Sequence, residues 1–194
     1  MVINENWRRK MKATQQLKNE HEGIKLMLNI METICDDLEK GKQLDINHYE
    51  KILEFIKGFA DKCHHGKEED ILFPELIGHG MSKEGGPIAV MLHEHQLGRD
   101  YIKSLSSALE EYKGGNKAAI NIVILNSRSY IELLRNHIEK ENNILFMMAD
   151  RVLNDTEQSK IFDAFEELEV KKIGLGKHEE YHNLLKELKI FYLK

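Results

Sequence analysis

HHGKEEDILF at residues 64–73 and HIEKENNILF at residues 137–146 follow the same pattern. Each has a histidine, a glutamate four residues later, and the run Ile-Leu-Phe beginning three residues after the glutamate. A Glu-His pair at 20–21 recurs at 94–95 with nearly the same offset along the chain. Side chains four residues apart lie on the same side of a helix. The repeats therefore predict two related helical hairpins whose half-sites face each other, an arrangement that suits two metal ions.

Apolar side chains around these repeats recur at alternating steps of three and four residues, the spacing of one buried helical face. The pattern predicts four long helices, which run from Thr14 to Gly41, from Asp45 to about Pro74, from Pro87 to Gly114 and from about Lys117 to Leu153. Thr14 and Asp45 suit helix N-caps, whereas Pro74 is expected to stop or kink the second helix. Long helices with short connections indicate an all-α fold, an antiparallel up-down-up-down four-helix bundle.

The chain is expected to have a tail at residues 1–13, the bundle at 14–153 and a helical extension at 154–194. We expect the two short helices of the extension to pack on the outside of the bundle or over one end. His178 and His182 form another pair with a spacing of four residues in the last helix. They are either the solvated end of an amphipathic helix, or a supplementary ligand or cap at the open end of the bundle.

Composition limits the class of protein. The 194 residues suffice for one domain, and 2 prolines and 13 glycines favour helices. A net charge of −5 without a basic tract argues against a nucleic-acid partner. No apolar run approaches 18 residues, so no membrane span is expected. The first dozen residues lack the apolar region of a signal peptide, and two cysteines fit a reducing cytoplasm. We therefore expect a cytoplasmic protein.

Ten histidines are the unusual feature of the composition. Four of them and two glutamates interrupt the apolar faces of the long helices, at His21, His64, Glu68, His95, His137 and Glu141. A single histidine on such a face is ordinarily a core residue hydrogen-bonded to a neighbour. Burying an unpaired carboxylate costs several kcal/mol, however, so two on facing helices call for a shared cation. Imidazole and carboxylate donors without thiolate suit iron, manganese or zinc.

The repeats also choose between neighbouring candidates. Only the 64/68 register matches 137/141 and the apolar face, so we expect His65 and Glu69 to face solvent or to contact the ligands from outside. His95 lies on the apolar face of the third helix, whereas His93 lies two residues, about 200°, away around the helix. His95 is therefore the expected ligand of the third helix.

Four segments together resemble the hemerythrin-like (HHE cation-binding) family: EH at 20–21, CHHGKEEDILFPEL at 63–76, MLHEHQLGR at 91–99 and HIEKENNILF at 137–146. The resemblance covers about residues 14–153. It implies a four-helix bundle around a non-haem di-iron centre, with two iron ions bridged by carboxylates. Carried over by position, the implied ligands are His21, His64, Glu68, His95, His137 and Glu141.

Two departures separate this chain from the oxygen-carrying members of that family. Those members have a second histidine one turn from the third-helix ligand, where this chain has Met91 and Arg99. Their last carboxylate is an aspartate five residues after a histidine, whereas Glu141 follows His137 by four. The missing histidine implies a more open site. The pattern is closer to members linked to oxygen, nitric-oxide or iron-sulfur stress than to simple reversible oxygen carriers.

Three functions follow as hypotheses. The first is a protein that binds or senses oxygen or nitric oxide at an open di-iron centre. The second is an enzyme on the same site that turns over peroxide or nitric oxide, or supplies iron in cluster repair. The third is a metal-free helical interaction module. The ferritin-like di-iron class is disfavoured because its Glu-x-x-His spacing occurs only at Glu179 and His182.

Overall fold

The computed structural model describes residues 11–193, and helices are the only regular secondary structure in that range. The all-α expectation is therefore confirmed for the described residues. Residues 1–10 of the predicted tail (1–13) lie outside the described range. The elements are α2 (Ala13–Glu39), α3 (Ile46–Phe55), η1 (Ile56–His65), η2 (Glu68–Leu72), α4 (Phe73–Gly78), α5 (Pro87–Lys113), α6 (Ala119–Lys140), η3 (Glu141–Leu145), α7 (Phe146–Val152), α8 (Asp155–Lys172) and α9 (Lys177–Tyr192).

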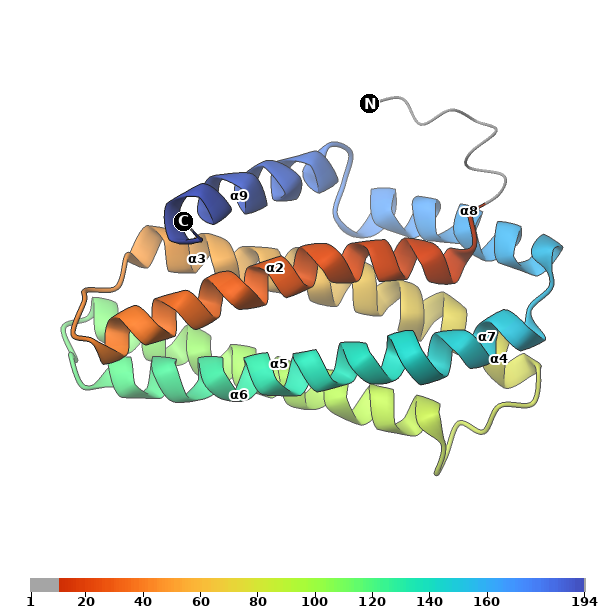
Figure 1. Ribbon diagram of the computed structural model, residues 1–194, viewed down its shortest axis with the longest axis horizontal. Coiled ribbons are helices and arrows are strands. Elements are labelled where there is room, and N and C mark those ends of the chain that lie inside the picture. Colours follow the sequence, from red (N-terminus) through yellow and green to blue (C-terminus); the bar gives the residue numbers. More distant parts are fainter. Residues whose placement is uncertain (1–10, 194) are drawn as a thin grey trace.

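The long helical segments lie side by side along the longest axis of the molecule (Figure 1). Helix α2 contacts α6, and α5 contacts α3, η1 and, most extensively, α6. Helices α8 and α9 lie along one side of this assembly, where α8 contacts α2, η1 and η2 and α9 contacts α2 and α3. None of the described helices combines the length and the apolar character needed to cross a bilayer.

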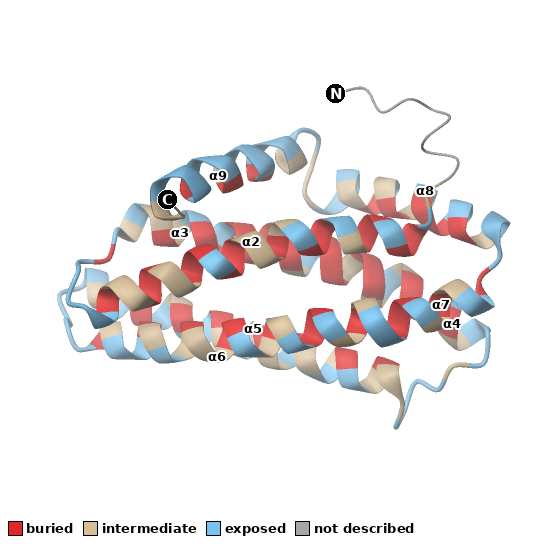
Figure 2. Ribbon diagram, in the orientation of Figure 1, coloured by how far each residue is buried: buried red, intermediate tan, exposed pale blue. Residues whose placement is uncertain are grey.

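The buried side chains form two apolar clusters separated by a polar layer. On α2, Leu17 belongs to one cluster and Ile24 to the other, and the buried His21 lies between them. The predicted histidines and glutamates of the other long segments occupy the same level. The buried positions run along the inward faces of the helices (Figure 2). Apolar packing on both sides thus fixes the helices around the polar layer.

Helix ends match the sequence prediction where a residue at the helix end itself determines them. Asp45 caps α3 by accepting a hydrogen bond from His48 N–H at 3.0 Å, and α5 begins at Pro87. The predicted Thr14 cap is wrong, because α2 already begins at Ala13. The Ala13 N–H instead donates to Gln158 Oε1 at 2.9 Å, a partner from α8 that local signals do not reveal.

The second and fourth long segments contain π-helical stretches, η1, η2 and η3, which the sequence pattern does not predict. A π turn bonds residue i to i+5 and so holds one more residue than an α turn. The buried face therefore advances by one residue after Glu141, to Ala149 and Leu153. Val152, which an uninterrupted alternation of three and four residues would place on that face, is 41% exposed. These stretches are common at functional sites.

Pro74 was expected to stop or kink the second segment, and it does not stop it. It lies in the first turn of α4, immediately after η2, and the helix continues to Gly78. Pro74 has no N–H and therefore donates no helical hydrogen bond at the junction between η2 and α4. The change from π to α geometry therefore accommodates this residue.

Candidate metal centre

The six residues predicted as ligands meet in the polar layer. His21 comes from α2, His64 from η1, Glu68 from η2, His95 from α5, His137 from α6 and Glu141 from η3. Each is at most 1% exposed. They fall into two groups whose donor atoms lie within 4.8 Å of one another, and Glu68 belongs to both. The folded chain thus brings all the predicted residues together.

The four histidines form two pairs. His21 Nε2 lies 2.9 Å from His64 Nε2, and we call this pair the first half-site. His95 Nε2 lies 3.1 Å from His137 Nε2, and this pair is the second half-site. Each half-site thus takes one histidine from each of two helical segments, as the repeat predicts.

Each glutamate reaches both half-sites. Glu141 places Oε2 3.2 Å from His21 Nε2 and Oε1 3.2 Å from His137 Nε2. Glu68 places Oε1 3.6 Å from His64 Nε2 and Oε2 3.4 Å from His95 Nε2. One oxygen of each carboxylate therefore faces each half-site, which is the placement of a carboxylate that bridges two cations.

The chemistry of these donors fits a metal. All four oxygens of Glu68 and Glu141 are buried and lack a hydrogen-bond donor among the described residues. Buried carboxylates without partners are strongly unfavourable, and a cation removes that cost. Nitrogen and oxygen donors, without thiolate, match the preferences of iron, manganese and zinc.

The pKa values reflect crowded charges. Burial and the nearby Glu141 raise the pKa of Glu68 well above its usual range. Burial lowers the pKa of His137, but Glu141 and Glu94 outweigh it and raise the pKa to about 9. Burial lowers the pKa of His64 to about 4. Without a cation, the crowded charges thus favour the protonated forms of Glu68 and His137.

Acidic side chains outside the layer orient the imidazoles. His64 Nδ1 donates to Glu20 Oε2 at 2.8 Å, and His137 Nδ1 donates to Glu94 Oε2 at 3.0 Å. These bonds leave each Nε2 facing the glutamates, as is usual for metal-bound histidine. Glu20 directly precedes His21, and Glu94 directly precedes His95. Each Glu-His pair of the repeat therefore supplies one predicted ligand and one acid that orients an imidazole of another helix.

The other two histidines have partners that also follow the repeat. His95 Nδ1 donates to Glu69 Oε1 at 2.7 Å, and His21 Nδ1 donates to Asn142 Oδ1 at 2.9 Å. Glu69 therefore contacts a predicted ligand from outside, which was one of its two expected placements. Glu69 and Asn142 occupy equivalent positions, just after the two glutamates that reach both half-sites.

The Ile-Leu-Phe runs of the repeat have a role beyond the apolar core. Phe73 stacks on His95 with ring centroids 6.1 Å apart, and Phe146 stacks on His21 with centroids 5.6 Å apart. Each repeat thus covers an imidazole that comes from a different helix. Both rings belong to one of the two apolar clusters. They close the polar layer on the side of that cluster and hold the imidazole planes.

His65 takes the second of its two expected placements, because it contacts the predicted ligand His95 rather than solvent. It is only 5% exposed, and its ring stacks on His95 with centroids 3.8 Å apart and planes 14° apart. The π geometry of η1 widens the inward face enough to include two consecutive residues. The repeat could have indicated that His65 is buried, because position 65 is equivalent to Ile138, which is also buried.

The remaining histidines take no part in the two metal-capable groups. His93 is exposed, as expected. His178 Nδ1 lies 2.8 Å from Glu169 Oε1, an ion-pair distance, and its ring lies 4.7 Å from that of His182. Glu169 also accepts a hydrogen bond from Lys67 at 2.8 Å. The extension therefore contacts the surroundings of the first half-site rather than the metal-capable groups.

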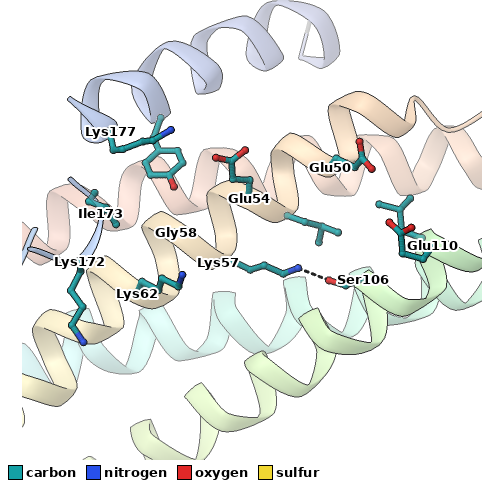
Figure 3. Close-up of a pocket in the computed structure, with 13 residues that line it drawn as sticks. Glu50, Glu54, Lys57, Gly58, Lys62, Ser106, Glu110, Lys172, Ile173 and Lys177 are labelled. Atoms are coloured by element: carbon teal, nitrogen blue, oxygen red, sulfur yellow. Dashed lines mark hydrogen bonds between the residues drawn. The ribbon is translucent and has the colours of Figure 1, made fainter. Parts of the chain in front are cut away.

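Access to the polar layer differs between the half-sites. A pocket of about 350 Å³ reaches His65 and His95, and Tyr130 and Arg99 also line it. A second pocket, of about 500 Å³, lies between α3, α5 and the extension (Figure 3). Its wall mixes lysine and glutamate side chains and includes none of the predicted ligands. The first pocket is therefore the one relevant to the layer.

Comparison with known proteins agrees with this geometry. A family model described as the hemerythrin HHE cation binding domain matches residues 12–149. The resemblance seen in the sequence is thereby confirmed over nearly the range expected. No solved structure gives a significant match.

Curated relatives match parts of the chain. The iron-sulfur cluster repair protein YtfE of Pectobacterium atrosepticum is 39% identical over 92 residues, which cover 45% of this chain and 41% of that protein. YtfE of Dickeya chrysanthemi is 37% identical over 91 residues with the same coverage. An uncharacterized protein of Mycobacterium bovis is 23% identical over 162 residues, 84% of this chain and 63% of that protein. The matches thus span about two fifths of the length of the repair proteins.

Proposed function

Because the chain belongs to the hemerythrin HHE cation-binding domain family, we propose that it holds two iron ions bridged by Glu68 and Glu141. The other protein ligands in this proposal are His21, His64, His95 and His137. Residues 14–153 form an antiparallel up-down-up-down four-helix bundle around the ions. Residues 154–194 are the extension in this proposal, and its helices α8 and α9 pack on the bundle.

One observation carries the proposal. Glu68 and Glu141 each extend one oxygen toward each half-site, and all four oxygens are buried without a hydrogen-bond donor among the described residues. A single cation would satisfy only one half-site. Two cations use every carboxylate oxygen and every Nε2 of the two histidine pairs.

The donor set alone is compatible with iron, manganese and zinc. Family membership and the similarity to iron-sulfur cluster repair proteins favour iron. An iron pair with open coordination positions supplies binding and redox chemistry for a small diatomic ligand or peroxide. The chain contributes an apolar cover on one side, since Phe73 and Phe146 stack on imidazoles there.

We propose that the centre binds or senses oxygen or nitric oxide. The pocket of about 350 Å³ offers a route from the surface to the second half-site. Small ligands would enter past Tyr130, which is 2% exposed, and reach His65 and His95. Outside the layer, Glu20, Glu69 and Glu94 hold the imidazoles in place.

A second candidate function is an enzyme of oxidative or nitrosative stress on the same centre. The observation that favours it is the similarity to YtfE, whose name assigns it to iron-sulfur cluster repair. Turnover of peroxide or nitric oxide, or delivery of iron to a damaged cluster, would use the same six ligands. A metal-free helical module is the remaining alternative.

The deciding experiment is anaerobic purification with elemental analysis, followed by optical spectra on adding oxygen and then nitric oxide. Two irons per chain and a reversible charge-transfer band support binding or sensing. Two irons with irreversible oxidation and catalytic loss of peroxide support the enzyme instead. One zinc without iron would contradict the di-iron proposal, and no metal at all would leave the helical module.

A further inference from the structure

A third pocket, of about 310 Å³, lies between α2, α8 and α9, and we call it the outer pocket. It borders the first half-site through Glu20, the acid that orients His64. Unlike the two pockets described above, it has no lysine or arginine among its described lining residues. The ionisable residues that line it are three glutamates and two histidines, Glu20, Glu166, Glu169, His178 and His182. This wall therefore favours a cation.

The charge of the outer pocket is only partly balanced by Lys67, which lies behind its wall. The buried ammonium group bonds Glu20 at 2.5 Å and Glu169 at 2.8 Å. Three carboxylates and one ammonium leave two negative charges when both histidines are neutral, the form in which histidine binds a metal. A divalent cation would balance this charge.

The two histidines of the outer pocket have the spacing of a metal-binding pair. His178 and His182 stand four residues apart in α9, so their side chains lie on the same side of the helix. Their ring centroids are 4.7 Å apart. The segment HEEYH at 178–182 matches the pattern H-E-x-x-H, in which two histidines on one face of a helix bind zinc. The pattern is short, so the surroundings must supply the rest of the site.

Glu169 supplies the third donor from α8. Its Oε1 lies 2.8 Å from His178 Nδ1, yet this buried nitrogen has no hydrogen-bond partner among the described residues. The polar layer has the same kind of contact, where Glu141 Oε2 lies 3.2 Å from His21 Nε2 without a hydrogen bond. A shared cation accounts for such a pair of donor atoms. Two imidazoles and one carboxylate are a donor set that zinc takes, with water in the fourth position.

We propose that the outer pocket binds one zinc ion, held by His178, His182 and Glu169. This site does not depend on the proposed iron pair, because none of its ligands belongs to the polar layer. Its donors are less closely gathered than the two groups of the layer, whose atoms all lie within 4.8 Å of one another. His182 is exposed and turns toward the ion when it binds. The zinc therefore exchanges with solution more readily than metal in the layer, and it links α9 to α8.

Elemental analysis distinguishes zinc from iron, so the iron-loaded protein is suitable for the test. The untagged full chain would be dialysed against increasing zinc(II), as wild type, His182→Gln and His93→Gln. His93 is the matched control, because it is also an exposed histidine. We expect one zinc in addition to the iron in the wild type and in the control. In His182→Gln, zinc should bind at least roughly tenfold more weakly, with the iron content unchanged.

X-ray absorption at the zinc edge gives a second measurement, because it reports only the surroundings of zinc. We expect two imidazoles and oxygen donors in the wild type, and one imidazole in His182→Gln at saturating zinc. If that variant does not fold by circular dichroism, the wild-type spectrum still decides, and fewer than two imidazoles would overturn the outer site.

The outer site and the iron pair can fail separately. No zinc in addition to the iron, equal zinc affinity in wild type and His182→Gln, or zinc that binds only as iron is lost would overturn the outer site and leave the iron pair untouched. A chain without iron that still binds zinc through His182 would overturn the iron pair alone.

Discussion

The ammonium group of Lys67 lies 2.5 Å from Glu20 Oε1 and is completely buried. Its equivalent in the repeat, Lys140, bonds Glu94 but remains 37% exposed. The difference arises from the extension, because Glu169 of α8 supplies a second carboxylate 2.8 Å from Lys67. Lys67 holds the acid that orients His64, so the extension buries the outer ion pair of one half-site, whereas the equivalent pair of the other stays partly exposed.

Replacing Lys67 by methionine is expected to destabilise the protein far more than replacing Lys140. Removing one partner of a buried ion pair leaves uncompensated charge and costs about 3–5 kcal/mol. An exposed pair contributes about 0–1 kcal/mol. Burial raises the pKa of Glu20, but Lys67 and His64 outweigh burial and lower it to about 2, so Lys67→Met removes the main group that stabilises this buried carboxylate. Urea unfolding of Lys67→Met and Lys140→Met measures both, and equal losses would contradict this account.

Substituting either glutamate of the layer is expected to release metal. Glu68→Ala and Glu141→Ala each remove an oxygen ligand from both half-sites, so at least one of the two ions should be lost. Glu139→Ala is the matched control, since Glu139 is exposed and lies two residues before Glu141. Elemental analysis of the purified variants gives the metal content directly. Retention of two ions in both layer variants would mean that neither carboxylate bridges.

Much of this site follows from the sequence, because histidine and glutamate stand out on apolar helical faces. A period of 3.6 residues places His21, His64, His95 and His137 at one level, and the repeat selects Glu68 over Glu69. The structure places them all in the buried layer. Such agreement is expected where one residue type is costly to bury without a partner.

The rest depends on features that a regular helical period does not contain. The π turns at Glu68 and Glu141 shift the buried face by one residue, and they depend on hydrogen bonding throughout the segment. The same geometry buries His65, which a strict α period places beside the inward face. Contacts between distant parts, such as Ala13 with Gln158, are likewise invisible to local signals.

Metal binding is expected to release protons. Burial and Glu141 raise the pKa of Glu68 well above its usual range, and the pKa of His137 is raised to about 9. Both shifts favour the protonated form of the group, and a bound cation favours the deprotonated form. The apparent affinity should fall with falling pH, by roughly tenfold per pH unit for each displaced proton.

Calorimetric titration with metal in buffers of different ionisation enthalpy counts the protons released on binding. We expect net proton release at neutral pH, with His137 contributing because its pKa is raised to about 9 and His64 contributing little because burial lowers its pKa to about 4. Affinity that is independent of pH below neutrality would show that the metal displaces no proton, and would place the metal away from these two residues.

Removing the metal is expected to lower thermal stability while leaving most of the helix. The two apolar clusters hold the helices together on both sides of the layer, so circular dichroism should change little at room temperature. Metal bound only to the folded state contributes RT ln(1 + [L]/Kd), about 4 kcal/mol at a thousandfold excess over Kd. For a chain of this length that corresponds to a decrease in Tm of roughly 10 °C.

The loss of stability should also be local, because the metal contacts the polar layer and not the two apolar clusters. Without a cation, Glu68 and Glu141 crowd four imidazoles in a buried site, and hydration or loosening of the helices relieves this. We expect amide protection to fall most over 64–73 and 137–146, where the π turns have irregular hydrogen bonding. Hydrogen exchange on chelated and reloaded protein measures it, with the part of α5 beyond His95 as an internal reference. An unchanged exchange pattern together with an unchanged Tm would mean that the six residues hold no metal.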